Sequence, residues 1–335
     1  MATPTIRALR EHFGPAATIT GIQRPYVKEV LAGTNWLSNC IEFNPKGKWR
    51  SRRGTLSLAL ELRRRKFDTA IILPNSPRPA FASWLAGIPQ RLGYVRYCRG
   101  PLLTERVDPL RDGRKFQPIS ALNYYLTLAE SLGANVDNRR IELSSTPEFD
   151  KAAERFWSQH DLHNRRVIAF NTGGAYGAAK SWPSEHFADL AKRLVSEPNT
   201  RVVVMCGPAE AETADRICGL AGSPYVHSMS GQKLSIGLTK AAIKRSELLI
   251  TTDSGPRFFG TAFGIPTITI FGSTDPQWSA TGHPLEFNVN ISVDCGPCAR
   301  RVCPLKHHRC MRDLTSEFIY AKAVSVLTEH QRRAA

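Results

Sequence analysis

The feature that most constrains the fold is a regular alternation of apolar and amphipathic segments in the second half of the chain. Apolar runs typical of buried strands cover residues 167–170, 201–206, 248–251 and 267–271. Helical patterns lie among them at residues 184–196, 209–220, 235–244 and 256–263. Strands that alternate with helices of this length predict a doubly wound parallel sheet, whose ligands bind beyond the carboxyl ends of the strands.

The first half of the chain shows the same α/β character more weakly. Strands are expected at residues 17–22 and 69–73, and helices at residues 54–66, 81–86 and 117–132. The 335 residues exceed what one hydrophobic core usually supports. Residues 144–165 mix helix formers with polar residues and show no strong strand, so we place the domain boundary there. We therefore expect two domains, residues 1–150 and 151–335.

Charge restricts the class of partner. The chain has 45 basic and 29 acidic residues, a formal net charge of +16, which favours an anionic partner. The basic clusters at residues 46–53, 63–66 and 300–301 lack the interleaved aromatic residues of a single-strand-binding surface, so no nucleic-acid partner is expected. No run of about 18 apolar residues exists, and the first residues do not resemble a signal peptide. We expect a cytoplasmic protein.

The turn after the strand at residues 248–250 is the strongest candidate site. It carries Asp253, Ser254 and Gly255 just before a helical segment. Free N–H groups and the dipole at a helix N-terminus attract anions, so this turn could hold the ribose and phosphates of a nucleotide. The alternative is that Asp253 or Ser254 only caps the helix. Three further turns follow predicted strands, at residues 171–174, 207–210 and 272–275.

Two of these turns contain further candidates. Thr172 and Gly173 open a loop of small residues that lets the backbone approach a ligand and ends at Lys180. Lys180 could pair with a diphosphate or could be a solvated lysine, and the order of a Walker loop is absent. Glu210 could bond a ribose hydroxyl or could favour its own helix through the dipole, with Glu212 as a competing candidate. Trp182 is expected in the core.

A cysteine-rich segment lies near the C-terminus. It contains Cys295, Cys298, Cys303 and Cys310 together with His307 and His308. Thiols and imidazoles are zinc ligands, but the spacing is not that of a zinc ribbon or finger. Because disulfides are rare in cytosolic proteins, a reduced or partly paired cysteine cluster is the first interpretation and a structural metal the second. We expect no cofactor.

Several motifs together resemble one family. They are residues 73–76 with 86–93, residues 177–183, residues 252–255 with 271–276, and residues 295–311 with 313–315. With these motifs the chain resembles the ADP-heptose:lipopolysaccharide heptosyltransferases of glycosyltransferase family 9, nearest to the heptosyltransferase II branch. The resemblance implies a GT-B fold of two Rossmann-like domains. It also implies inverting, metal-independent transfer of heptose onto the lipopolysaccharide inner core.

The resemblance also implies roles for the candidate residues. Lys180 would contact the donor phosphates, Glu210 the ribose, and Asp253, Ser254 and Gly255 the sugar diphosphate, with Thr172, Gly173 and Arg257 completing the donor site. The first domain would hold the acceptor near Asn75 and Ser76. Its basic surface would suit phosphorylated core sugars at the inner membrane face, so peripheral membrane contact is expected.

The chain departs from the family pattern in two places. Family members have a buried strand and a Gly-Asp turn, which provides the proposed catalytic base, just before the segment that resembles residues 2–10. We therefore expect the first sheet to lack one strand. Either the start codon is assigned too late, or this relative is truncated and only binds sugar nucleotides. In addition, Phe258 stands where the family often has histidine. Either Arg257 supplies the positive charge there or the donor is another nucleotide sugar.

Overall fold

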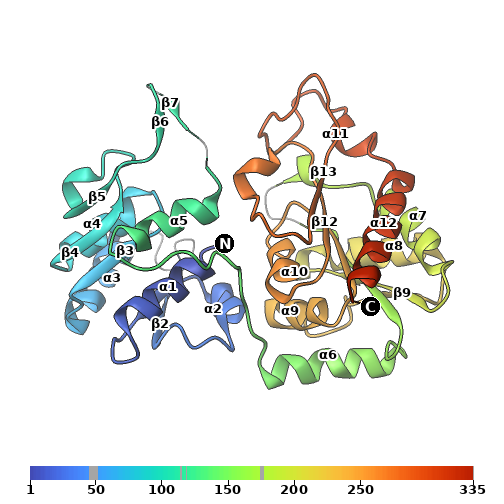
Figure 1. Cartoon of the computed structure of the whole chain (residues 1–335), viewed down its shortest axis with the longest axis horizontal. Helices are drawn as coiled ribbons and strands as arrows, with labels where there is room; N and C mark the ends of the chain where they lie inside the picture. Colours follow the sequence, from blue (N-terminus) through green and yellow to red (C-terminus); the bar gives the residue numbers. More distant parts are fainter. Residues whose placement is uncertain (45–51, 114, 118, 174–176, 335) are drawn as a thin grey trace. The chain divides into compact units, whose positions relative to one another are not determined.

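The computed structural model describes residues 1–44, 52–113, 115–117, 119–173 and 177–334, and its chain divides into two compact units (Figure 1). Unit 1 contains Met1–Lys28, Asn35–Arg139 and Gln277–Ala280. Unit 2 contains Glu29–Thr34, Arg140–Pro276 and Thr281–Ala335. Each unit thus includes a short segment from the region of sequence that mainly builds the other. The two units therefore do not correspond to two continuous stretches of sequence that meet at residues 150/151.

Unit 2 is built on a six-stranded parallel sheet in the order β10-β9-β8-β11-β12-β13. The strands are β8 (Arg166–Asn171), β9 (Thr200–Met205), β10 (Val226–Ser228), β11 (Leu248–Thr252), β12 (Thr267–Ile270) and β13 (Glu286–Val289). Numbered from β8, this is the order 3-2-1-4-5-6 of a Rossmann fold, with its topological switch point between β8 and β11. The predicted doubly wound sheet is confirmed.

Helices cover both faces of this sheet because successive strand residues point to opposite sides. Ile168 and Phe170 of β8 pack in a cluster with α7 (Ser184–Val195), α8 (Ala211–Ala221) and α12 (Ser316–Ala334). Val167 and Ala169 pack in another cluster with α6 (Pro147–Gln159), α9 (Ile236–Lys244) and α10 (Arg257–Phe263). All residues of β11 and β12 are buried, the threonines of both strands included.

Short elements of unit 2 were not predicted. They are the 3-10 turns η2 (Ala178–Lys180), η3 (Pro208–Glu210) and η4 (Pro276–Ser279), the strands β10 and β13, and α11 (Arg309–Arg312). β10 has only three residues, and β13 carries the polar Glu286 and Asn288, so neither gives an apolar run. Among the described residues, no helix is both long and apolar enough to cross a bilayer.

The parallel strands of unit 1 form two separate sheets, β1–β2 and β3–β4–β5, accompanied by an antiparallel pair β6–β7. The strands are β1 (Thr20–Gln23), β2 (Asn39–Glu42), β3 (Thr69–Ile72), β4 (Gln90–Tyr94), β5 (Glu105–Val107), β6 (Arg111–Asp112) and β7 (Lys115–Phe116).

The helices of unit 1 are α1 (Thr3–Phe13), α3 (Arg52–Arg65), α4 (Pro77–Leu85), η1 (Gly100–Leu102) and α5 (Ala121–Glu130), while α2 (Pro25–Leu31) begins in unit 1 and continues into the unit 2 segment at Glu29. The sequence predicted α3, α4 and α5 but missed α1 and α2. α1 has proline in its first turn and buries Ala8 and Leu9 against Ala129 of α5. Ser120 caps α5 by accepting a hydrogen bond from the Asn123 N–H at 3.3 Å. Most of the basic cluster at residues 46–53, namely 46–51, lies outside the described residues.

The segment Glu29–Thr34 is anchored in unit 2 by Lys240 of α9. Lys240 is fully buried, and its ammonium group donates to the carbonyl oxygens of Glu29, Val30 and Ala32 at 3.0, 3.0 and 2.9 Å. Burial lowers the pKa of Lys240 to about 8, against the opposing charges of Asp150 and Glu29. The Glu29 carboxylate also accepts a hydrogen bond from the Gly237 N–H at 3.1 Å. A short piece of early sequence is therefore an integral part of unit 2.

Candidate functional site

The four predicted post-strand turns lie at the carboxyl ends of β8, β9, β11 and β12. Asn171 ends β8, and its side-chain amide donates to the Thr251 hydroxyl at 3.0 Å and to the Ser254 hydroxyl at 2.9 Å. These bonds join β8 to the turn after β11, on the two sides of the switch point. The turn with Asp253 and Ser254 is therefore fixed at the position where Rossmann sheets bind ligands.

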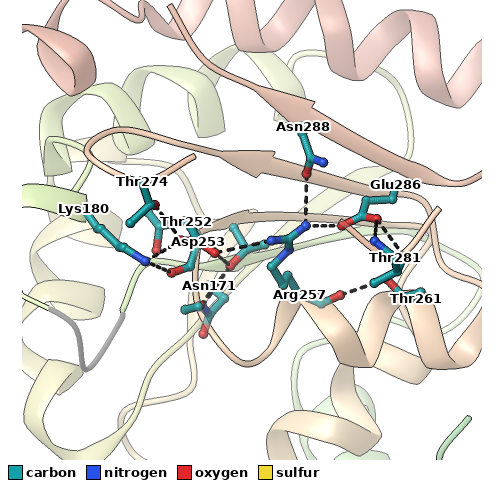
Figure 2. A network of polar contacts seen from close by, with 12 residues as sticks. Asn171, Lys180, Thr252, Asp253, Arg257, Thr261, Thr274, Thr281, Glu286 and Asn288 are labelled. Carbon is teal, nitrogen blue, oxygen red and sulfur yellow. Dashed lines mark hydrogen bonds and ion pairs between the residues drawn. The ribbon is translucent and has the colours of Figure 1, made fainter. Parts of the chain in front are cut away.

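Asp253 is the centre of a polar cluster that Figure 2 shows from close by. The Lys180 ammonium contacts Oδ2 of Asp253, to which the Thr274 hydroxyl also donates at 2.8 Å. The side chains of Lys180 and Asp253 are only 10% and 13% exposed. Burial alone would raise the pKa of Asp253, but hydrogen bonds from Lys180 and Thr274 and the charges of Lys180 and Arg257 lower it overall. The cluster therefore contains a stable carboxylate that holds a lysine in place.

Arg257 lies beside Asp253 and has a side chain that is 1% exposed. Its Nη1 lies 3.3 Å from Oδ1 of Asp253, while its Nη2 contacts Glu286 and donates to Asn288 at 3.1 Å. The Glu286 carboxylate also accepts bonds from the backbone N–H and the hydroxyl of Thr281 at 2.9 and 2.7 Å. The sequence left open whether Arg257 supplies a positive charge to the donor phosphates. Here its guanidinium is occupied by two carboxylates and orients Asp253 (Figure 2).

Glu210 reaches back from the turn after β9 towards the turn after β8. Its Oε2 accepts a hydrogen bond from the Gly207 N–H at 2.8 Å. A Cβ atom placed on Gly173 would lie 2.2 Å from the Glu210 carboxyl carbon, so this close approach requires glycine. The competing candidate Glu212 is exposed on α8. Glu210 is therefore the acid that lies at the carboxyl edge of the sheet.

Two hydroxyl groups at this edge are buried and lack a hydrogen-bond partner among the described residues, Thr172 Oγ1 and Ser273 Oγ. Their residues are 8% and 2% exposed. A buried hydroxyl without a partner costs about 1–3 kcal/mol, so most such groups in proteins are satisfied. Free hydrogen-bonding capacity beside Gly173 is consistent with a ligand contact at Thr172. Gly174, which belongs to the same predicted turn, lies outside the described residues, as do Ala175 and Tyr176.

α10 contributes less to anion binding than the sequence suggested. It begins at Arg257 and has seven residues, and no side chain caps its N-terminus. The alternative that Asp253 or Ser254 caps this helix is therefore wrong. The helix dipole acts over the first turn and is weak for so short a helix. The turn at Gly255 therefore depends more on Lys180 than on the helix for its positive potential.

The four clustered cysteines line one small cavity of about 50 Å³ together with His307, His308 and Ser273. All eight cysteines of the chain are free thiols. The Cys295 sulfur lies 3.7 Å from Nε2 of His307. Among the described residues, no three Cys, His, Asp or Glu side chains are arranged to hold a metal ion.

The cysteine-rich segment supports two turns of the candidate site through backbone bonds. The Ala299 N–H donates to the carbonyl of Ser273 at 2.6 Å, and the Ala179 N–H donates to the carbonyl of Arg301 at 3.1 Å. Trp182 is buried and donates to the carbonyl of Leu314 at 2.8 Å, which confirms its predicted place in the core. The segment therefore holds the neighbours of Lys180 and Thr274.

The two residues assigned to the acceptor lie in unit 1, just after β3. The Asn75 side-chain oxygen accepts bonds from the Tyr124 hydroxyl at 2.9 Å and from Arg99 Nη2 at 3.4 Å. Ser76 is exposed at the start of α4, and its side chain does not cap the helix. Arg99 and Tyr124 were not predicted from the sequence, because neither residue lies within a motif that pointed to a function.

Comparison with known proteins identifies the family. Residues 55–309 match the family model of glycosyltransferase family 9 (heptosyltransferase). The chain belongs to this family. Among curated relatives, lipooligosaccharide heptosyltransferase 2 of Campylobacter jejuni is 29% identical over 167 residues, which cover 49% of this chain and 52% of that protein. The chain thus spans about half the length of this relative.

Solved structures show the same fold for this family 9 chain. The glycosyl transferase family 9 protein of Veillonella parvula superimposes with a TM-score of 0.81 at 23% identity, covering 98% of this chain and 93% of that one. The ADP-heptose lps heptosyltransferase II of E. coli gives 0.76 at 21% identity, covering 98% and 95%. The expected GT-B fold of two Rossmann-like domains is confirmed.

Proposed function

We propose that this family 9 protein is an inverting glycosyltransferase that moves heptose from ADP-heptose to the lipopolysaccharide inner core. Unit 2 would bind the nucleotide sugar and unit 1 the acceptor. One observation carries the proposal, the Lys180–Asp253–Thr274 cluster at the switch point of a Rossmann sheet, with Glu210 beside it. The names of the Campylobacter and E. coli relatives support the choice of heptose and of a lipopolysaccharide-type acceptor.

Each residue of the donor site has a distinct proposed role. Glu210 accepts hydrogen bonds from the ribose hydroxyls, for which its second oxygen is suited because only Oε2 is bonded to Gly207. Lys180 pairs with the diphosphate, assisted by the Thr172 hydroxyl and by Ser254 and Gly255 in the adjoining turns. Gly173 leaves room for Glu210. In this proposal Asp253 orients Lys180, and Arg257 orients Asp253.

The proposed chemistry is a single displacement. An acceptor hydroxyl oxygen forms a bond to the anomeric carbon while the bond from that carbon to the diphosphate oxygen breaks, and ADP leaves with the electron pair. The configuration inverts, and the hydroxyl proton passes to a general base that we assign to no described residue. Lys180 stabilises the negative charge that develops on the departing phosphate, so this scheme uses no metal.

The proposed acceptor is anchored in a membrane, which implies peripheral contact with the cytoplasmic face of the inner membrane. α3 of unit 1 supports this part of the proposal, because its exposed Leu56 and Leu60 precede the basic Arg63, Arg64 and Arg65 on the same helix. Flotation with anionic vesicles tests it. Replacement of both leucines by serine should reduce the bound fraction, whereas equal binding would contradict this membrane contact.

Phe258 favours a second candidate function, transfer from a different nucleotide sugar. Its ring packs 4.9 Å from the Arg257 guanidinium, which is already paired with Asp253 and Glu286. Neither residue therefore offers a free donor group to a phosphate at the place where the family often has histidine. Donor selectivity separates the two candidates.

Calorimetric titration with ADP and ADP-heptose, compared with UDP and GDP sugars, tests the donor assignment. We expect tight binding of the adenine nucleotides and at least a 100-fold loss of affinity in Lys180→Ala. Lys192→Ala, which removes an exposed lysine from α7, is the matched control and should bind like the unchanged protein. Equal affinity in both variants would contradict the site, and preference for UDP or GDP sugars would support the second candidate.

Release of ADP in the presence of donor and acceptor tests for transfer itself. A transferase releases one ADP for each heptose added to the acceptor. Binding of ADP-heptose without product would instead indicate a module that only binds the nucleotide sugar. Mass spectrometry of the acceptor distinguishes transfer from simple hydrolysis of the donor.

A further inference from the structure

Unit 1 contains a second polar cluster, at the carboxyl end of β3, which differs in charge from the site in unit 2. Arg99 is fully buried, and its guanidinium donates to Tyr94 O at 2.8 Å, contacts Pro74 O and lies 3.4 Å from Ser76 O. Burial lowers the pKa of Arg99, with only the phenol of Tyr124 opposing it. Among the described residues, no carboxylate pairs with this cation.

Arg99 fixes the orientation of the Asn75 amide. A guanidinium can only donate hydrogen bonds, so the side-chain oxygen of Asn75 must face Arg99 and the Tyr124 hydroxyl. Tyr124 is itself held in place by its stack on Tyr94, with ring centroids 3.7 Å apart. The amide NH₂ group of Asn75 must therefore point away from Arg99, with its two donors free of partners in the described chain.

A second guanidinium, that of Arg96, lies beside this turn. It lies over the Phe116 ring at 3.9 Å, and its positive charge opposes the rise that burial causes in the pKa of Tyr124. Arg96 is half-buried, and none of the ion pairs in the described chain involves it. Two cations without acidic partners and a free amide donor thus meet at the carboxyl end of a parallel strand. A planar guanidinium beside an N–H donor matches the geometry of an oxyanion.

We propose that the turn at residues 74–76 is a receptor for an oxyanion, a phosphoryl or carboxylate group, on the acceptor. Asn75 and Arg96 contact the anion, while Arg99 and Tyr124 are positioning residues that orient Asn75. The inference rests on the proposed function, in which unit 1 binds the acceptor, and it defines that acceptor as a sugar that carries a negative charge close to the reacting hydroxyl.

Titration of the full chain with inorganic phosphate tests the receptor directly, in a Lys180→Ala background that removes the anion site of unit 2. We expect Arg96→Gln and Asn75→Asp each to weaken phosphate binding at least tenfold, and Tyr124→Phe about threefold. Arg111→Gln is the matched control, because Arg111 stacks on the same Phe116 ring at 4.4 Å but is not among the charges that act on Tyr124. Acetate in place of phosphate shows whether a carboxylate suffices.

Asn75→Asp separates a ligand contact from a structural role. The new carboxylate would neutralise Arg99, so Tm should be unchanged or higher while phosphate affinity is lost. The proposal is overturned if the Lys180→Ala protein binds no phosphate, if Arg96→Gln in that background titrates like Arg111→Gln, or if Asn75→Asp binds phosphate normally.

Kinetics with an inner-core oligosaccharide, before and after phosphatase treatment, link the receptor to catalysis. Arg96→Gln should raise KM at least tenfold for the phosphorylated acceptor alone, with kcat and ADP affinity unchanged. An equal rise for both acceptors would overturn a phosphoryl ligand. If the unchanged protein transfers no heptose, the proposed function fails, and the phosphate titration still decides the present inference.

Discussion

The two units surround their most buried arginines differently. Arg257 in unit 2 lies between the carboxylates of Asp253 and Glu286, and Asp253 also binds Lys180, so two cations balance two anions. Arg99 in unit 1 is bonded to backbone carbonyls and one amide instead. The first arrangement holds its own side chains in a fixed geometry, whereas the second leaves positive charge available for a ligand.

The hydrophobic core of unit 2 is larger and more continuous than that of unit 1. The sheet of unit 2 is continuous and is covered on each face by one large cluster of buried side chains. The strands of unit 1 form separate sheets, and its described buried residues form several small clusters. Because stability follows the apolar area buried together, we expect unit 1 to unfold first.

Loss of Arg257 should produce the largest effect. Arg257→Met leaves Glu286, whose side chain is 4% exposed, without its cation. Breaking a buried pair in this way costs about 3–5 kcal/mol of unfolding free energy, which urea titration measures. The double variant Arg257→Met/Glu286→Gln should recover much of the loss. A cost below about 1 kcal/mol for the single variant would show that unit 2 does not depend on this pair.

Loss of Arg99 should cost less unfolding free energy, because it leaves no buried carboxylate without a cation. Arg99→Met removes donors from the carbonyls of Tyr94 and Pro74, and unsatisfied acceptors of this kind cost about 1–3 kcal/mol. Urea unfolding monitored through Tyr94 and Tyr124 reports on unit 1. If this variant loses as much free energy as Arg257→Met, the contrast between the two units is wrong.

Acid should affect unit 2 through His227 of β10. Burial, together with the nearby His160 and Arg201, lowers the pKa of His227 to about 4. The unfolded chain takes up this proton near pH 6.5, so between pH 6.5 and 4 it binds more protons than the folded chain. The free energy of unfolding therefore falls as pH drops through this window and is constant below it. The total loss should be about 2 kcal/mol, because the group is partly exposed.

His227→Phe keeps a ring beside His160 but cannot take up a proton. The free energy of unfolding, measured from pH 7 to 4, should lose this part of its slope. Parallel curves for the His227 variant and the unchanged protein would contradict the assignment.

The smallest effect is expected at the cysteine cluster. Cys298→Ser places a more polar hydroxyl beside the small cavity and should cost about 1 kcal/mol, visible as a slightly lower Tm. The ADP affinity of the folded protein should stay intact, because the segment supports the site only through its backbone. A large loss of ADP affinity would mean that the thiol itself contributes to the site.

The sequence predicted those parts of the site that follow strong apolar runs. β8 and β11 are buried on both faces, so they appear as continuous hydrophobic segments, and the turns with Thr172 and Asp253 follow from their ends. Glu286 and Asn288 could not be found in this way. They lie on a short edge strand that contains polar residues and therefore shows no apolar run. Their importance depends on contact with Arg257, about thirty positions away in sequence.

The polar cluster around Arg99 in unit 1 could not be predicted from the sequence for a similar reason. β4 contains glutamine, arginine and glycine, and its pattern is too polar to predict a strand. Gly93 in that strand has a role visible only in three dimensions, because a Cβ atom there would lie 3.3 Å from Nη2 of Arg99. A sequence pattern records burial along one segment, whereas a buried arginine satisfied by distant carbonyls depends on the assembled unit.

The exchanged segments determine how the protein can be dissected. A fragment that begins at Arg140 would lack Glu29–Thr34, and Lys240 would lose its three carbonyl acceptors while remaining buried. A fragment that ends at Arg139 would lack Gln277–Ala280. Independent expression of either half would therefore yield an incomplete domain. A hybrid enzyme that takes its second half from another family member should also take residues 29–34 from the same parent.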